Sequence, residues 1–206
     1  IVYFTQTALR TPVKIAIFLG GMEFDTYITL YKEITGTTDF PSYNPEVFRS
    51  VLQEKDTFLL PEVVPGSGQY TTSKPGILEK GKFFPLNDIK SKKSIPELFK
   101  NPERLLAVLD ISLVIQTITA LQRAGMKEGT NIFTEGGFRK NKGYNQLLAS
   151  VLNNHSVQLT NMEEATAFGA RTVVENYAAH GVCVSELFVT GGICKKNPML
   201  MQIYAD

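Results

Sequence analysis

Apolar residues recur at helical spacing most clearly between Leu105 and Ala124. The apolar positions there surround almost the whole cylinder, which predicts a helix that is largely buried. A narrow polar stripe interrupts them at helical spacing, formed by Ser112, Gln116, Thr119 and Arg123. Gly125 follows at the position where a left-handed glycine commonly ends a helix. The stretch Leu105–Leu121 also contains Asp110 and several hydroxyls, which are too costly for a lipid-facing helix, so it is expected to be a core helix.

Shorter apolar runs predict strands. They are Val2–Thr7, Val13–Leu19, Asn131–Thr134, Ser156–Thr160 and 185–190. Two further helices are predicted in the first third of the chain, over Met22–Glu33 and over 41–55, the second with Asn44 as cap and Pro45 in first position. Two more are predicted later, one from the glycines at 136 and 137 to Leu152 and one from the capping box at Thr160–Glu163 to Ala179, which Gly181 closes. Most of the ten prolines lie between Pro61 and Pro102, where we expect loops and one hairpin.

Two Gly-Gly pairs stand at the ends of predicted strands. The first lies in "FTEGGFRKNKGYNQLLAS" (Phe133–Ser150) and the second in "FVTGGICKKNPMLMQIYAD" (Phe188–Asp206). Both follow the order helix, closing glycine, strand, Gly-Gly, helix, which suggests a repeated unit, although a chance α/β likeness is the alternative. Glycine lets the main chain approach a ligand closely, so such a loop suits the sugar or phosphates of a nucleotide. A plain turn is the other interpretation.

Composition excludes several function classes. The chain has 206 residues, 43% hydrophobic and 20% charged, with a net charge of +1, which is typical of a soluble globular protein and implies no bulk attraction to nucleic acid or to an anionic membrane. The two cysteines, Cys183 and Cys194, are expected to be reduced, and with two histidines they offer neither a metal site nor a nucleophile. No leader is visible and no Met begins the chain, so we expect a cytoplasmic protein and a start inside a longer sequence.

Three blocks resemble the C-terminal half of the FGGY family of carbohydrate kinases. They are "TPVKIAIFLGGMEFDTY", "TEGGFRKNKGYNQLLASVL" and "VQLTNMEEATAFGA". The last two carry, in family order, the Gly-Gly loop, a Lys-Asn pair, an Asn-Gln helix start and a Glu-Ala-x-Ala-x-Gly-Ala helix. The resemblance implies an α/β fold of the actin-like ATPase, ribonuclease-H-like type, a mixed sheet flanked by helices. It also implies ATP with Mg²⁺ in a cleft between two such domains.

The resemblance further implies a set of nucleotide-binding residues. They are Glu135, Gly136, Gly137, Asn141, Ala165 and Gly169. The two loop glycines would contact the adenosine and phosphates, with Asn141 beside them. Glu135 could meet a ribose hydroxyl or be a solvated loop carboxylate. Ala165 and Gly169, one turn apart, would either back the nucleotide or serve tight helix–sheet packing.

The chain departs from the family by carrying a second Gly-Gly unit. We interpret residues 1–206 as a single C-terminal domain with a repeated strand-Gly-Gly-helix unit at 171–206. The first part resembles rhamnulose- and fuculose-kinase relatives, whereas "ARTVVENYAAHGV" and the tail resemble the ribulokinase branch. The junction falls near Gly169–Arg171. A genuine duplication and a fusion of two related sequences both remain open.

A sugar kinase also needs a carboxylate to take the proton of the acceptor hydroxyl. In the family that Asp belongs to the preceding half, and no residue here matches it. Glu23 and Asp25 are an acidic pair, but two residues apart on a helix they do not share a face. We therefore predict the ATP-binding half of a carbohydrate kinase, without catalytic or metal-ligating residues and inactive without its N-terminal half, which would bind the sugar. The alternatives are a nonenzymatic, truncated or chimeric actin-like module, or a heat-shock-type ATPase. Without the N-terminal half, the apolar wall of the cleft between the two domains would be exposed, and this would favour homo-oligomers.

Overall fold

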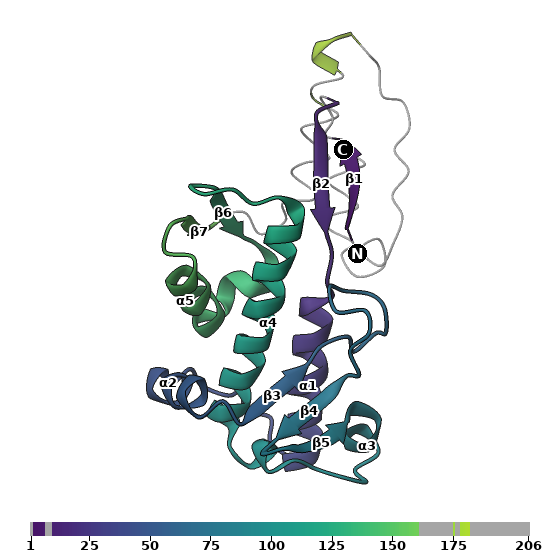
Figure 1. Cartoon of the computed structure of the whole chain (residues 1–206), viewed down its shortest axis with the longest axis vertical. Helices are drawn as coiled ribbons and strands as arrows, with labels where there is room; N and C mark the ends of the chain where they lie inside the picture. The colour runs from purple at the N-terminus through teal and green to yellow at the C-terminus, as the bar shows by residue number, and fades with distance from the viewer. Residues whose placement is uncertain (1, 7–9, 161–174, 176–177, 182–206) are drawn as a thin grey trace. The chain divides into compact units, whose positions relative to one another are not determined.

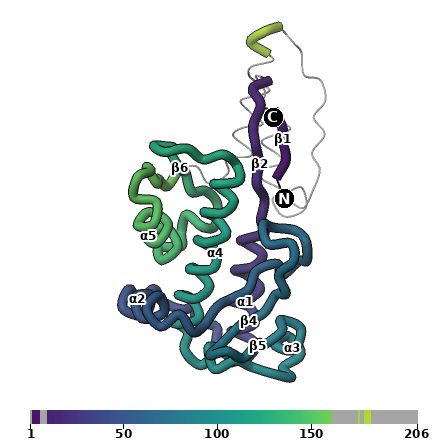
Figure 2. Tube along the Cα trace, in the orientation of Figure 1, coloured from purple at the N-terminus to yellow at the C-terminus, as the bar shows by residue number. Residues whose placement is uncertain are grey.

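The computed structural model describes residues 2–6, 10–160, 175 and 178–181. Contacts divide the chain into two units, Ile1–Leu159 and Thr160–Asp206, and the elements below all belong to the first unit. Most of the helix predicted from the capping box at 160–163, the strand at 185–190 and the second Gly-Gly pair lie outside the described residues. Gly181, predicted to close that helix, has φ +76° and donates its N–H to the carbonyl of Ala178 at 3.0 Å. Figure 1 labels the elements along the chain, and Figure 2 follows the same path as a Cα trace.

The core forms around one long helix, α4 (Pro102–Ala124). Asn101 caps its start by accepting a hydrogen bond from the main-chain N–H of Arg104, and Gly125, with φ 95°, ends it as expected. Helices α1 (Gly20–Thr35), α2 (Pro45–Glu54) and α5 (Lys142–Val151) all contact α4 (Figure 2). In the part of the chain that the structure describes, α4 is the one helix long and apolar enough to span a membrane, and most of it is buried in the core.

The polar stripe of α4 forms hydrogen bonds to helix α1 and to the segment that follows α2. Ser112 donates to the carbonyl of Leu59 at 3.0 Å, and the Gln116 amide donates to Glu23 at 3.0 Å. The next two stripe residues continue the pattern, with Thr119 bonded to the Tyr70 hydroxyl and Arg123 donating to Gln69. Buried polar groups need such partners, and this explains Ser112 and Gln116. Thr119 is half-buried and Arg123 is exposed, so the stripe runs from the core to the surface.

The proline-rich region contributes two strands to a small antiparallel sheet, and the third precedes it. Strand β3 (Thr57–Leu60) pairs with β4 (Gly76–Glu79), and β4 forms a hairpin with β5 (Lys82–Pro85). The short helix α3 (Leu86–Lys90) and the 3-10 turn η1 (Glu97–Lys100) lead on to α4. The expected hairpin is confirmed.

The N-terminal strands form a second antiparallel pair, β1 (Val2–Gln6) with β2 (Pro12–Ala16). Strand β2 ends before the predicted Leu19, and α1 begins at Gly20 rather than at Met22. Gly20 and Gly21, which lie between the predicted strand and the predicted helix, therefore form the opening turn of α1. The cap at Asn44 is confirmed, because its side chain accepts from the N–H groups of Glu46 and Val47.

A β-α-β unit completes the described part. Strand β6 (Asn131–Thr134) runs into the 3-10 turn η2 (Gly136–Lys140), then α5, then β7 (Ser156–Leu159), and β6 and β7 pair in parallel. The α/β class is thus confirmed, with both strand orientations present. The described strands form three small sheets rather than the one mixed sheet expected, since each pairs only with neighbours along the chain or across α5.

Candidate functional site

The glycine pair lies where a parallel strand ends. β6 buries Ile132 and Thr134 and reaches its carboxyl end at Thr134, opposite Leu159 of β7. Ligands of α/β proteins bind in crevices outside the carboxyl ends of parallel strands. The loop at Gly136 and Gly137 therefore occupies a position that suits a ligand.

The main chain at this loop is open. Gly136 has φ +64°, a left-handed conformation that strains any residue with a Cβ atom. A Cβ atom built on Gly136 or Gly137 would meet no atom within 4 Å, and both residues are exposed. Glycine is thus required at 136 by backbone conformation, while nothing in the packing requires it at 137. Open space at a bare main chain fits the requirement of a nucleotide cradle.

Below the loop, aromatic rings hold it in place. Phe138 packs against Tyr144 of α5 with ring centroids 4.7 Å apart, and edge-to-face against Phe24 of α1 at 6.2 Å. Aromatic pairs at these separations are favourable beyond the area they bury. The glycines are therefore carried on a turn whose next residue is anchored between two helices.

Asn141 closes the loop and begins α5. Its side-chain oxygen accepts from the N–H of Tyr144 at 3.0 Å, as a helix cap does, and its amide nitrogen donates to Asp110 of α4 at 2.6 Å. Asn145 then ties the turn together by donating to the carbonyls of Phe138 (2.6 Å) and Asn141 (2.7 Å). Both ends of the Asn141 side chain are engaged within the protein, so its direct contact with a nucleotide stays a prediction.

Asp110 is the buried charge at this junction. Its side chain has no solvent exposure, and burial raises its pKa to about 7, with the side chain of Asn141 and the main-chain N–H of Tyr144 acting in the opposite direction. Its second oxygen, Oδ2, has no hydrogen-bond partner. A Cβ atom on Gly143 would lie 2.7 Å from that oxygen and 2.8 Å from the ring of Phe48. The absence of a side chain at Gly143 therefore provides the space that the carboxylate of Asp110 occupies.

The remaining sequence-predicted residues divide into three groups. Glu135 precedes η2, is exposed and makes no capping hydrogen bond. Ala165 and Gly169 lie outside the described residues. Glu23 is buried whereas Asp25 is exposed, so the prediction that this pair does not share a face is confirmed. Within the described residues no group of three or more His, Cys, Asp or Glu could hold a metal ion.

Sequence reasoning missed the support of the loop, namely Asp110, Phe138 and Gly143. A signal for Asp110 was present, since a carboxylate stands in the middle of the most apolar helix. Its partner could not be read from the sequence, because Asn141 is 31 residues away.

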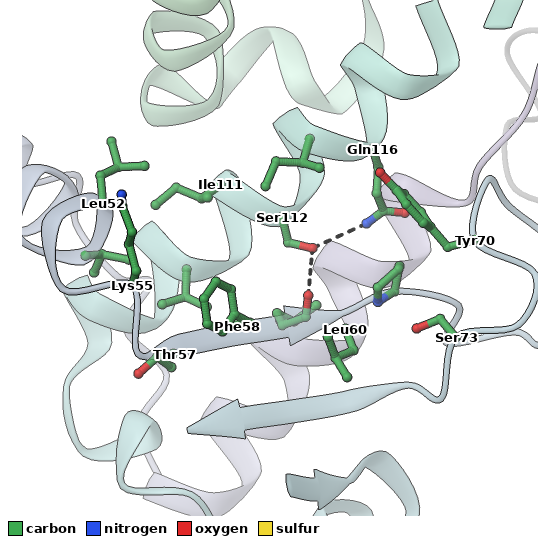
Figure 3. Close-up of a pocket in the computed structure, with 15 residues that line it drawn as sticks. Leu52, Lys55, Thr57, Phe58, Leu60, Tyr70, Ser73, Ile111, Ser112 and Gln116 are labelled. Carbon is green, nitrogen blue, oxygen red and sulfur yellow. Dashed lines mark hydrogen bonds between the residues drawn. The ribbon is translucent and has the colours of Figure 1, made fainter. Parts of the chain in front are cut away.

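A second feature is an apolar groove of about 460 Å³ between β3 and α4 (Figure 3). Leu52 of α2 and Lys55, which follows α2, lie at one end and Tyr70 and Ser73 at the other, with Ile111 and Phe58 along the walls. Its lining contains neither the two loop glycines nor Asn141. The groove and the loop are therefore separate features of the same unit.

The comparisons with known proteins identify the family of the chain. The family model "Carbohydrate kinase FGGY, C-terminal domain" matches residues 5–181, which is most of the chain. A second model, "FGGY family of carbohydrate kinases, C-terminal domain", matches residues 162–206. The chain therefore belongs to the FGGY carbohydrate kinases, as a C-terminal domain, and the C-terminal domain of this family has an actin-like ATPase fold.

Curated relatives match a short segment at the C-terminus of the chain. Over 43 residues it is 63% identical to a ribulokinase of Mycolicibacterium smegmatis, 51% to one of Bacillus licheniformis and 54% to one of Geobacillus thermodenitrificans. Each match covers 21% of this chain and 8% of the relative. No solved structure matches the chain. The expected family and the ribulokinase-like tail are both confirmed.

Proposed function

We propose that the chain is the ATP-binding half of a carbohydrate kinase that transfers the γ-phosphate of ATP to a sugar hydroxyl, and that it is inactive without an N-terminal half. The observation that carries the proposal is the open main chain at Gly136 and Gly137, outside the carboxyl end of β6. Membership of the FGGY family supports the choice of nucleotide over other ligands.

The proposed roles follow from position. The main chain at 136 and 137 would contact the adenosine and phosphates, and Glu135, exposed beside them, would meet a ribose hydroxyl. Ala165 and Gly169 are proposed to back the nucleotide. The described residues provide no metal-ligand cluster, so Mg²⁺ is expected to be held chiefly by the nucleotide phosphates, as is common for this ion.

We propose that the general base for the acceptor hydroxyl belongs to the missing N-terminal half. Of the acidic pair on α1, Glu23 is buried and bonded to Gln116, whereas Asp25 is exposed. Incubation of the purified chain with ATP-Mg²⁺ and a panel of ketoses and aldoses should give no sugar phosphate. Turnover that disappears in Asp25→Asn would refute the half-enzyme proposal.

Nucleotide binding can be tested with a matched pair of glycines. Gly136 and Gly129 are both exposed, both have positive φ (+64° and +75°), and neither has an atom within 4 Å of a built Cβ. Gly136→Val and Gly129→Val should therefore lose similar stability, about 1–2 kcal/mol. Titration calorimetry with ADP should show binding to the wild type and to Gly129→Val, but not to Gly136→Val. Equal affinities in all three proteins would remove the loop from the nucleotide site.

The apolar groove favours a second candidate, a nonenzymatic interaction module. Phe58 (45% exposed) and Ile115 (50% exposed) open into the groove, and apolar surface of this kind marks interaction sites. A ligand that binds only the native state raises its stability by mass action. No thermal shift at millimolar ADP, together with a concentration-dependent oligomer in light scattering, would favour this candidate. Cytoplasmic location and homo-oligomer formation remain predictions under either candidate.

A further inference from the structure

We propose that Asp110 is a positioning residue for the nucleotide loop, because its carboxylate holds Asn141 and thereby sets the path on which the chain leaves Gly136 and Gly137. The inference rests on the proposed function for the role of the loop as a nucleotide site, but the contacts between Asp110, Asn141 and the loop do not depend on that function. Asp110 lies on α4 and has no solvent exposure, so it acts through Asn141 rather than by touching a ligand.

Asn141 connects α4 to the loop through two hydrogen bonds, one to α4 and one within the turn. Asn141 donates its amide to Oδ1 of Asp110 at 2.6 Å, and the main-chain N–H of Asn141 donates to the carbonyl of Phe138 at 3.0 Å. Phe138 directly follows the second glycine. The orientation of the Asn141 side chain and the closure of the turn are thus linked through one residue.

Capping of α5 does not by itself explain a carboxyl group at position 110. The Asp110 carboxyl lies near the main-chain N–H of Tyr144, but the side-chain oxygen of Asn141 already accepts from that N–H at 3.0 Å. A buried carboxylate with one oxygen unpartnered is unfavourable, and an apolar residue of similar size is often neutral or stabilising in such a place. What the carboxylate adds is a fixed acceptor for the other end of the Asn141 side chain. Supporting residues that orient a contacting group in this way are common around functional sites.

A second tie between α4 and α5 provides an internal control. Thr117, two turns after Asp110 on α4, shares a hydrogen bond of 2.7 Å with the hydroxyl of Tyr144. This tie reaches α5 at its third residue through the Tyr144 hydroxyl and leaves the amide of Asn141 unchanged. Loss of either tie should loosen the packing of the two helices, but loss of the Asp110 tie, which also frees the Asn141 side chain, should alter the loop more.

The test compares Asp110→Ala, Thr117→Val and Asp110→Asn by ADP titration calorimetry, with urea unfolding to match their stabilities. Asp110→Ala should weaken ADP binding on the order of tenfold or more, because small misplacements of positioned groups have effects of this size. Thr117→Val should bind within about twofold of the wild type. Asp110→Asn keeps an acceptor oxygen for Asn141 and should restore most of the affinity. If Asp110→Ala does not fold, Asp110→Ser replaces it, since its side chain is too short to reach Asn141.

Hydrogen exchange separates this inference from the proposed function. Without any ligand, Asp110→Ala or Asp110→Ser should speed exchange of the amides at 136–141 more than Thr117→Val does. If the wild type binds no ADP but this exchange pattern is found, the proposed function fails and the positioning role stands. Unchanged exchange in the loop, or an equal loss of ADP affinity in Thr117→Val, would overturn the positioning role.

Discussion

The buried carboxylate of Asp110 should make the stability of this unit depend on pH in an unusual direction. Burial raises its pKa from 3.8 to about 7 in the folded protein, so the native state keeps its proton over a range in which the unfolded chain has lost it. Stability therefore falls as pH rises from about 4 to about 7 and is constant above that range. A difference of about three pKa units corresponds to about 4 kcal/mol, as an order of magnitude.

Asp110→Asn removes this titration while keeping the shape of the side chain. The free energy of unfolding of the variant, minus that of the wild type, should rise by about 1.4 kcal/mol per pH unit between about pH 4 and 7. The amide nitrogen of the new side chain would face the position of Oδ2, which has no partner, and this adds a constant that does not depend on pH.

Urea unfolding at pH steps from 4 to 8.5 measures the difference. The chain contains no tryptophan, so far-UV circular dichroism is the suitable probe. Other titrating groups are common to both proteins and cancel in the difference. A difference that stays flat across this range would show that Asp110 is not desolvated as the structure has it. A slope of opposite sign would show that its ionised form is the one the fold stabilises.

Three further predictions concern packing, a second buried acid and a cap. Gly143→Ala should destabilise by about 1–3 kcal/mol through overpacking, whereas Gly137→Ala, with open space around it, should stay within about 0.5 kcal/mol of the wild type in the same urea assay. Burial also raises the pKa of Glu23 to about 7, so Glu23→Gln should gain stability relative to the wild type as pH rises from about 4.5 to 7, and equal slopes would refute this. Asn44→Ala should cost about 1 kcal/mol through loss of the cap, which thermal unfolding would detect.

Local rules allowed several parts of the fold to be predicted. Helix α4 with its closing Gly125, the cap at Asn44 and strand β6 were all recognised, because the spacing of apolar residues and the chemistry of caps act over a few residues. The start of α1 was placed two residues late, at Met22, although Gly20 and Gly21 adopt helical conformation.

The support of the candidate site could not be predicted in this way. Asp110 and Asn141 meet across 31 positions, and Phe138 contacts Phe24 of a helix more than a hundred residues earlier. Such pairs arise only when helices pack, and the same residue types at the same spacing would allow many other pairings. The acidic residue in the apolar helix could be noticed, but not what it binds.

The amino-acid sequence by itself determined the family, the position of the Gly-Gly loop after a strand and the polar stripe of the central helix. Each of these depends on residue identity within a short window or on an ordered set of motifs. Only the tertiary structure decided that the loop glycines face open space, that the stripe binds the segment around Leu59 and Gln69, and that a buried carboxylate holds the end of the loop. The physical reason is that burial, desolvation and long-range hydrogen bonds depend on which surfaces meet, and packing alone settles that.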